Sequence, residues 1–216
     1  DSLEILAFLL SKNYNIHTLD LSYNKFTSKG VSKLCQGIMS KDTRLIELSL
    51  SNNNLDETSL TYLSEAINNS EQLYSLNLSY NNFSKGDCGM IISDIIRKDN
   101  KLKNFNLTAC HLGLKTKDIF EALEENQTIT FIDLSVNDIG NNLEMFKGLA
   151  KMLQKNKTIK YLYLDTNYIT DRDFEIIINE GITKSVNLNY LSLKSNKITL
   201  IAIKKLSDSI KKDQRK

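Results

Sequence analysis

The chain has 216 residues, of which 41% are hydrophobic and 25% are charged, and its formal net charge is +2. This hydrophobic content is sufficient for a packed core and excludes an intrinsically disordered chain. A balance of 28 basic and 26 acidic residues disfavours nucleic acid as a partner, and without a run of 18 apolar residues we expect no membrane insertion.

Residues 1–15 have the spacing of a helix that no strand precedes. Leu3, Leu6 and Leu10 recur on one helix face. Since the chain begins with Asp1 rather than Met, we expect it to be a fragment of a longer protein. The expected organisation is a single domain over residues 1–216, with a partial repeat at 1–15 and seven repeats at 16–216.

From residue 16 onward the sequence repeats a motif of the form LxxLxLxxNxL, in which x is any residue. A fixed period of this length is the signature of stacked structural repeats. The chain is therefore expected to be an array of near-identical units. The Asn position of the motif recurs every 27 to 30 residues, at Asn24, Asn53, Asn81, Cys110, Asn137, Asn167 and Asn196.

Each unit is expected to form one strand followed by one helix. Apolar and polar residues alternate within the motif, as they do in a strand with one buried face. Apolar residues then return at about seven, ten and fourteen places beyond the Asn position, which lie on one helix face. In the last unit these are Ile203, Leu206 and Ile210. Because such crossovers are right-handed, the sequence predicts seven parallel strands in one sheet with all helices behind it.

The Asn position has a structural explanation. Where each strand leaves the sheet, backbone groups would be buried without partners, and an inward amide supplies both donors and an acceptor to neighbouring turns. Cys110 replaces one of these amides with a small group that donates weakly, and buried Cys is tolerated as a small hydrophobe. We therefore expect a ladder of stacked side chains along the repeat axis.

The repeated motif resembles the leucine-rich repeat family, and its period is similar to that of the ribonuclease-inhibitor-like subtype. Ran GTPase-activating protein and the sensor domains of NOD-like receptors share that subtype. The resemblance covers nearly the whole chain and implies an α/β right-handed solenoid, or horseshoe, that binds other proteins on its inner sheet. Helices need about 10 Å each and strands about 4.8 Å, so the strands are expected on the concave face and the helices on the convex face.

Cysteine usage indicates a reducing, intracellular compartment. Cys35, Cys88 and Cys110 fall at helix or ladder positions, and three residues cannot form a full disulfide set. The Cys-rich caps of extracellular leucine-rich repeat proteins are absent. Heavy use of Lys, Asn and Ile is typical of an AT-rich genome, which favours secretion by a bacterium into a host cell cytosol as one hypothesis.

No enzyme or cofactor motif is present in the sequence. It contains no HExxH, paired CxxC, GxSxG or phosphate-binding Gly loop. Its two histidines, His17 at a strand entrance and His111 beside a ladder position, have no metal or nucleophile partner by spacing. We therefore expect no catalytic residue, no metal and no small-molecule cofactor.

Candidate binding residues lie at outward strand positions. The residues before and after the first inward Leu of each motif form two columns across the sheet. The residue after the second inward Leu forms a third column. Small polar residues fill these columns in repeats one to four, and aromatic residues appear from repeat five. The candidate partner-binding residues are Phe131, Asp133, Tyr161, Tyr163, Asp165, Tyr190 and Lys194.

Two explanations of these aromatic residues stay open. Exposed aromatic side chains are typical anchors of protein interfaces, because they bury a large area with few rotatable bonds. Alternatively, Tyr and Phe have high strand propensity and stack across neighbouring strands. Tyr23, Tyr80 and Tyr168, just beyond the strands, would extend a contact along the rim.

Three functional hypotheses follow. The first is a noncatalytic module that binds a folded protein through its sheet and inhibits or recruits it, for example as a bacterial effector. The second is a GTPase activator resembling Ran GTPase-activating protein, although Arg44, Arg97, Arg172 and Arg215 all lie outside the outward columns. The third is a substrate-recruiting domain of a larger enzyme.

Overall fold

The computed structural model describes residues 2–12, 15–98, 101–140 and 142–213. These residues form one open parallel sheet in which seven strands lie in the order of the sequence. The strands are β1 (Thr18–Asp20), β2 (Glu47–Ser49), β3 (Ser75–Asn77), β4 (Asn104–Asn106), β5 (Phe131–Asp133), β6 (Tyr161–Tyr163) and β7 (Tyr190–Ser192).

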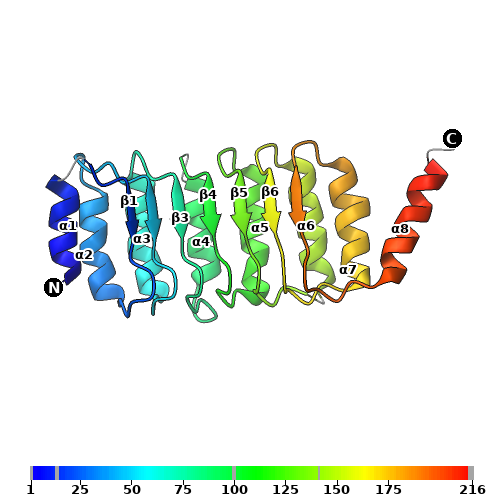
Figure 1. The fold of residues 1–216 in the computed structure, drawn as a ribbon, viewed down its shortest axis with the longest axis horizontal. Helices are drawn as coiled ribbons and strands as arrows, with labels where there is room; N and C mark the ends of the chain where they lie inside the picture. Colours follow the sequence, from blue (N-terminus) through cyan, green and yellow to red (C-terminus); the bar gives the residue numbers. More distant parts are fainter. Residues whose placement is uncertain (1, 13–14, 99–100, 141, 214–216) are drawn as a thin grey trace.

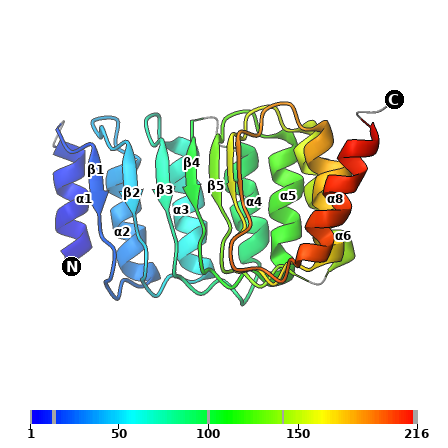
Figure 2. The ribbon, with the colours of Figure 1, turned by 45° about the vertical axis from the view of Figure 1, so that its right-hand side comes forward.

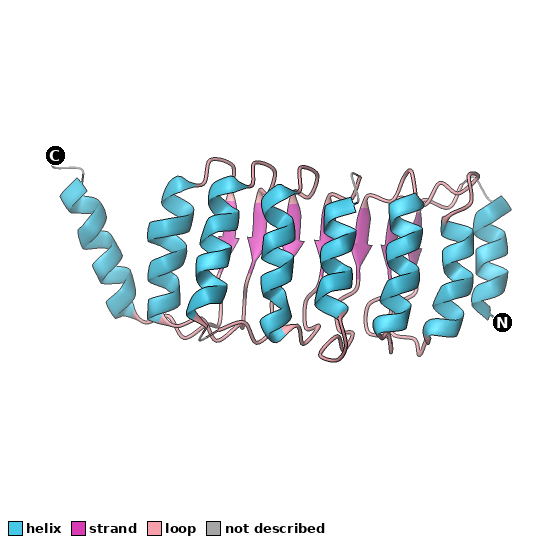
Figure 3. Cartoon of the chain, turned by 180° about the vertical axis from the view of Figure 1, so that it is seen from behind, coloured by secondary structure: helices cyan, strands magenta, loops and turns pink. Residues whose placement is uncertain are grey.

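Helices cover one face of this sheet (Figures 1, 2 and 3). The α-helices are α1 (Ser2–Lys12), α2 (Ser28–Ile38), α3 (Glu57–Asn69), α4 (Cys88–Lys98), α5 (Thr116–Glu125), α6 (Leu143–Lys155), α7 (Asp171–Ile176) and α8 (Leu200–Asp213). A 3-10 turn, η1 (Gly113–Lys115), precedes α5, and α7 continues as a π-helical segment, η2 (Ile177–Gly181), and a 3-10 turn, η3 (Ile182–Lys184). The predicted solenoid, with strands on one face and helices on the other, is confirmed.

A continuous hydrophobic core lies between the two layers and runs from Leu10 to Ile177. The inward residues of the strands and helices are buried because every repeat presents the same apolar positions to its neighbours. Phe83, Phe105, Phe120 and Phe146 fill the centre of the stack. The repeats therefore share one core rather than forming separate cores.

The predicted asparagine ladder is present. In the fifth repeat, Asn137 Nδ2 donates to the backbone oxygens of Leu107, Leu134 and Ser135, and its Oδ1 accepts from the N–H groups of Cys110 and Leu112. The Cys110 thiol takes the donor role in its own repeat, because its Sγ donates to the backbone oxygen of Leu78 at 3.3 Å. The ladder joins each repeat to the one before it.

A second ladder, which the sequence analysis did not predict, lies at the end of the helices. Asn126 Nδ2 donates to the backbone oxygen of Ile96 at 2.7 Å, and Asn156 Nδ2 donates to that of Leu123 at 2.7 Å. Each Oδ1 also accepts from the N–H three residues later, at Ile129 and Ile159. These side chains terminate the helices and start the next strands.

The residue before the Asn position has a positive φ in all seven repeats. This left-handed conformation turns the chain away from the sheet, and it is unfavourable for residues with a branched Cβ. Val136 and Thr166 adopt it, with φ of 58° and 54°. Asn52, at the same position of the second repeat, is a residue that tolerates it well.

One prediction about the helices is wrong. In α8 the core-facing residue is Ala202, which is buried, whereas Ile203 is half exposed. Leu206, predicted on the same face, is partly buried and lines a cleft beside Phe174, so the assignment is wrong at Ile203 and not at Leu206. The side chain of Ile210, assigned to the same face, lies outside the described residues.

Candidate functional site

The outward columns are in register across the whole sheet. Phe131 pairs with Tyr161, Tyr161 pairs with Tyr190, and Asp133 pairs with Tyr163 as parallel neighbours. Because parallel strands in register stack like positions side by side, the three aromatic residues of the first column become adjacent. The first two columns predicted from the sequence alternation are therefore confirmed.

The four aromatic candidates form one contiguous group, which we call the aromatic patch: Phe131, Tyr161, Tyr163 and Tyr190. The ring centroids of Phe131 and Tyr163 lie 5.2 Å apart, those of Tyr163 and Tyr190 5.1 Å apart, and those of Tyr161 and Tyr190 6.4 Å apart. All three pairs are tilted, a geometry favourable for aromatic rings. The patch thus spans β5, β6 and β7.

The patch is accessible from the sheet face. Tyr161 is 43% exposed and Tyr190 is 38% exposed, while Phe131 and Tyr163 are half buried between them. Within the described residues, none of the three tyrosine hydroxyls has a hydrogen-bond partner. The tyrosines therefore combine apolar area with polar tips that are available to a partner.

The charged candidates are less free than expected. Asp133 Oδ1 accepts from the backbone N–H of Ser135 at 2.9 Å. Asp165 Oδ1 accepts from the hydroxyl of Ser192 and from the backbone N–H of Lys194 at 2.7 Å. Both carboxylates therefore support the strand exits, whereas the Lys194 side chain is exposed next to them. A role of these three residues in binding stays a prediction.

A hollow of about 340 Å³ adjoins the aromatic patch. Ser75, Asn77, Asn104 and Asn106 line it, and Phe131 also borders it. Asn77 and Asn106 each use Oδ1 to accept from a backbone N–H two residues later, which leaves their Nδ2 groups available to the hollow. An aromatic surface next to amide donors suits a protein segment with exposed carbonyl groups.

Residues along the rims extend the exposed surface. Tyr23, Tyr80 and Tyr168 are all exposed at the strand exits, as expected, and Lys197 lies over the Tyr168 ring. Ile46 and Tyr74, which are not among the candidates predicted from the sequence, are exposed at the strand entrances of repeats two and three. Their position just before the alternating segment gave no reason to assign them to the sheet face.

The thiols and histidines have no features of a catalytic or metal site. Burial raises the pKa of Cys35 and Cys110 to about 12 and that of Cys88 to about 11, so all three thiols are protonated near neutral pH. His111 Nδ1 lies 4.0 Å from Asp138 Oδ2 in a pair that is largely exposed. No group of three or more potential metal ligands occurs among the described residues.

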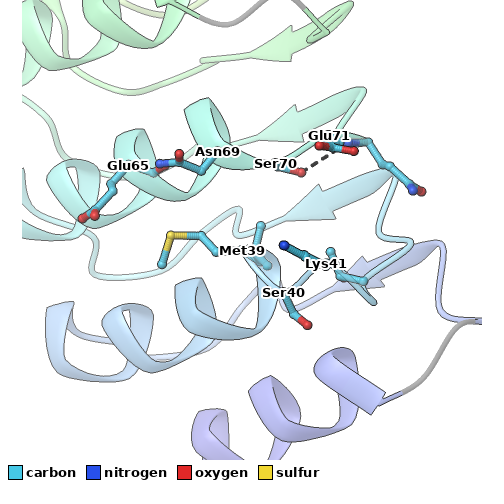
Figure 4. A pocket seen from close by; sticks show the side chains of 10 residues that line it. Met39, Ser40, Lys41, Glu65, Asn69, Ser70 and Glu71 are labelled. Atoms are coloured by element: carbon cyan, nitrogen blue, oxygen red, sulfur yellow. Dashed lines mark hydrogen bonds between the residues drawn. The ribbon is translucent and has the colours of Figure 1, made fainter.

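A larger groove lies between the C-terminal ends of α2 and α3 and the loops that follow them (Figure 4). Its volume is about 670 Å³, and its lining is mainly polar. Glu65 and Glu71 lie at opposite ends of the groove and Lys41 reaches between them, so the charges do not converge on one point. The groove lacks the aromatic anchors that the sheet face has.

Among the described residues no helix is long and apolar enough to cross a membrane. The repeated strand–helix stack with an accessible sheet face defines a solenoid of the protein-interaction class. Family models described as leucine rich repeat match residues 12–35 and 44–66. These two segments are leucine-rich repeats.

Curated relatives carry the same repeats in much longer chains. Mouse NACHT, LRR and PYD domains-containing protein 4C is 28% identical over 211 residues, which cover 95% of this chain but only 21% of that protein. Human NACHT, LRR and PYD domains-containing protein 3 is 32% identical over 124 residues, covering 56% of this chain and 12% of that protein. The chain thus spans about a fifth or less of the length of these relatives.

Solved structures show the same fold at low identity. The C-terminal domain of tropomodulin from Caenorhabditis elegans aligns with a TM-score of 0.56 and 17% identity, over 72% of this chain and 93% of that one. Internalin C2 from Listeria monocytogenes aligns with a TM-score of 0.53 and 19% identity, over 93% of this chain and 76% of that one. These alignments extend the fold assignment beyond the residues matched by the family models.

Proposed function

We propose that the chain is a noncatalytic module that binds a folded protein through the sheet face of repeats three to seven. The observation that carries the proposal is the aromatic patch. Four aromatic rings in mutual contact, two of them more than a third exposed, form the kind of surface on which interface anchors concentrate.

The geometry supports a partner that covers both the patch and the adjoining hollow. Phe131 belongs to the patch and also lines the hollow, so one contact surface would include both. The amide donors of Asn77 and Asn106 would then receive carbonyl groups of the partner. A partner bound there would be inhibited if its own active site met the patch, and recruited otherwise.

The GTPase-activating alternative has less support. Arg44 lies before β2, Arg97 lies at the end of α4, and Arg172 lies in α7, so none of these is on the sheet face. Arg215 lies outside the described residues. The described part of the structure does not test three other predictions. These are the bacterial effector role, the ribonuclease-inhibitor-like subtype and the substrate-recruiting domain, and they stay predictions.

The test compares two double variants of the chain. Tyr161→Ala/Tyr190→Ala removes the two most exposed rings of the patch, and Tyr62→Ala/Met90→Ala removes two exposed side chains on the helix face. Proteins captured by the wild type from the source cell are identified, and the affinity of each is measured by calorimetry. We expect the patch variant to lose about 2 kcal/mol or more, roughly thirtyfold, and the control to bind normally.

Both variants should unfold at nearly the temperature of the wild type, since the substituted side chains are exposed. A partner that binds the patch variant as tightly as the wild type would refute the proposal. Loss of binding in the control alone would place the interface on the helices instead.

A further inference from the structure

The hollow beside the aromatic patch has an uncharged lining. Serine, leucine, asparagine and phenylalanine side chains of β3, β4 and β5 line it, and none of these described residues carries a formal charge. Figure 1 shows the three strands side by side on the open face of the sheet. The next residues of the two columns are Glu47, beside Ser75, and Asp133, beside Asn106. A neutral segment therefore fits the hollow, and an acidic one does not.

The hollow offers hydrogen-bond donors that the fold does not use. Asn77 Oδ1 accepts from the N–H of Ser79 at 3.0 Å, and Asn106 Oδ1 accepts from that of Thr108 at 2.9 Å. Neither Nδ2 group donates to another described residue, and the hydroxyls of the three patch tyrosines can donate as well. A segment with exposed carbonyl groups therefore complements this surface, and it needs no N–H groups of its own.

Two common ways of presenting a protein segment do not suit this position. Addition of a strand needs a free sheet edge, whereas β3, β4 and β5 each have a paired strand on both sides. An amphipathic helix keeps its carbonyl groups in internal hydrogen bonds, so the asparagine donors would stay unpaired beneath it. The polyproline II conformation has no internal hydrogen bonds and exposes its carbonyl groups.

We propose that a proline-rich segment of the partner binds this surface in the polyproline II conformation, lying across the strands from β3 to β7. This proposal rests on the proposed function, because it specifies what the aromatic patch contacts. Proline rings of the segment pack on Phe131, Tyr161 and Tyr190, and its carbonyl groups accept from Asn77 and Asn106. Because proline has no N–H, it brings no donor that would be buried without a partner.

The strand spacing matches this ligand. Neighbouring strands are about 4.8 Å apart, so alternate strands present equivalent positions about 9.6 Å apart. One turn of polyproline II advances about 9.3 Å in three residues. Residues i and i+3 of the segment would therefore meet Phe131 on β5 and Tyr190 on β7, which share a column. The four spacings from β3 to β7, about 19 Å, correspond to about six residues of polyproline II.

The test measures binding of a fluorescein-labelled polyproline peptide of about ten residues, which is long enough to cross the surface. Fluorescence polarisation gives its affinity for the 216-residue chain. A Gly-Ser peptide of equal length is the control ligand, because it exposes carbonyl groups but is flexible and must be ordered on binding. We expect saturable binding of polyproline and binding of the Gly-Ser peptide that is weaker by about tenfold or more.

One pair of variants tests the asparagine donors. Asn77→Asp removes the Nδ2 donor and keeps the local bond, since Asp20 and Asp133 accept the N–H two residues later in the same column. Asn82→Asp is the matched control, because Asn82 Oδ1 makes the same kind of bond to the N–H of Ser84, and this exposed residue does not line the hollow. We expect Asn77→Asp to bind polyproline about fivefold more weakly, as for one lost hydrogen bond, and Asn82→Asp to bind it normally.

The aromatic contacts are tested with Tyr161→Ala/Tyr190→Ala, which should lower the affinity for polyproline by about tenfold or more. Circular dichroism checks that each variant is folded. The inference would be overturned if polyproline failed to bind the wild type, if the Gly-Ser peptide bound equally well, or if either the tyrosine variant or Asn77→Asp kept full affinity.

Failure of this inference is distinguishable from failure of the proposed function. If polyproline does not bind, but the partner captured from the source cell still requires Tyr161 and Tyr190, the partner site stands and only the proline-rich segment is wrong. If the captured partner binds the tyrosine variant as tightly as the wild type, the partner site itself is wrong, and the inference falls with it.

Discussion

Replacing Asn137 by Ala is the most direct test of how the repeats are held together. Asn137 is fully buried and makes five hydrogen bonds, which join its own repeat to the preceding one. After truncation the backbone oxygen of Leu134 keeps a donor, because Asn167 Nδ2 also donates to it at 2.8 Å. The backbone oxygen of Ser135 likewise keeps its bond from Ala109 N–H.

Three buried backbone groups are left without a partner: the oxygen of Leu107 and the N–H groups of Cys110 and Leu112. A buried polar group without a partner costs about 1 to 3 kcal/mol. A water molecule can enter the space left by the amide and reduce that cost, since the site is polar. We therefore expect the free energy of unfolding to fall by about 3 kcal/mol.

Asn24→Ala is the matched control. Asn24 occupies the same motif position, but it is exposed and, among the residues that the structure describes, bonds only within its own repeat. Its loss should cost less than about 1 kcal/mol. Urea denaturation followed by circular dichroism gives both values. The unfolding free energy must fall with urea concentration at the same slope in both variants, because stacked repeats can lose cooperativity. Equal shifts for the two variants would contradict the assignment of the ladder as the joint between repeats.

Three further substitutions test separate parts of the structure. Cys110→Asn should raise stability by about 1 kcal/mol, measured as the urea midpoint, because an amide is a stronger donor and acceptor than a thiol; a loss would mean that the site is too small. Val136→Asn should also add about 1 kcal/mol by relieving a branched side chain at φ 58°, and an unchanged melting temperature would argue against strain there. Burial raises the pKa of Glu124, but hydrogen bonds from Lys155 and Lys151 outweigh it and hold that pKa below its ordinary value. The resulting stabilisation of the fold is present above the ordinary pKa of Glu and is lost as pH falls through the lowered value. The wild type should therefore melt at a higher temperature than Glu124→Gln at neutral pH, and this difference should disappear in acid.

The motif predicted the strands well because each of its positions has one physical role. The Leu positions must be buried and the Asn position must satisfy backbone groups, so the alignment of repeats also aligned the columns of the sheet. The helices are less constrained. In α8 the inward position is Ala202 rather than Ile203.

The second ladder could not be predicted with the same argument. Asn126 and Asn156 occupy the position that Ser70 and Ser185 occupy in other repeats, so no single residue type marks it. Its role depends on a carbonyl group of the preceding helix, which lies about one repeat earlier in the chain. Only the three-dimensional stack brings the two together.

The aromatic patch was predicted as a set of neighbours, but its relation to the fold required the structure. In the second column, Asp20, Asn77, Asn106 and Asp133 each accept the N–H two residues later and so stabilise the strand exit. This structural role is invisible in a list of outward residues. It also explains why the aspartates of the candidate site are engaged rather than free.

Tyr163 departs from this pattern, as do Ser49 and Ser192 in the same column, but it is the aromatic residue among them. A tyrosine cannot accept the N–H two residues later, and the N–H of Asp165 donates instead to Ser135 Oγ of the neighbouring repeat at 3.1 Å. The ring therefore replaces a residue type that supports the strand exit elsewhere, and a neighbouring serine compensates for it. Tyr163 joins Phe131 to Tyr190 and makes the patch continuous, which the proposed binding role requires.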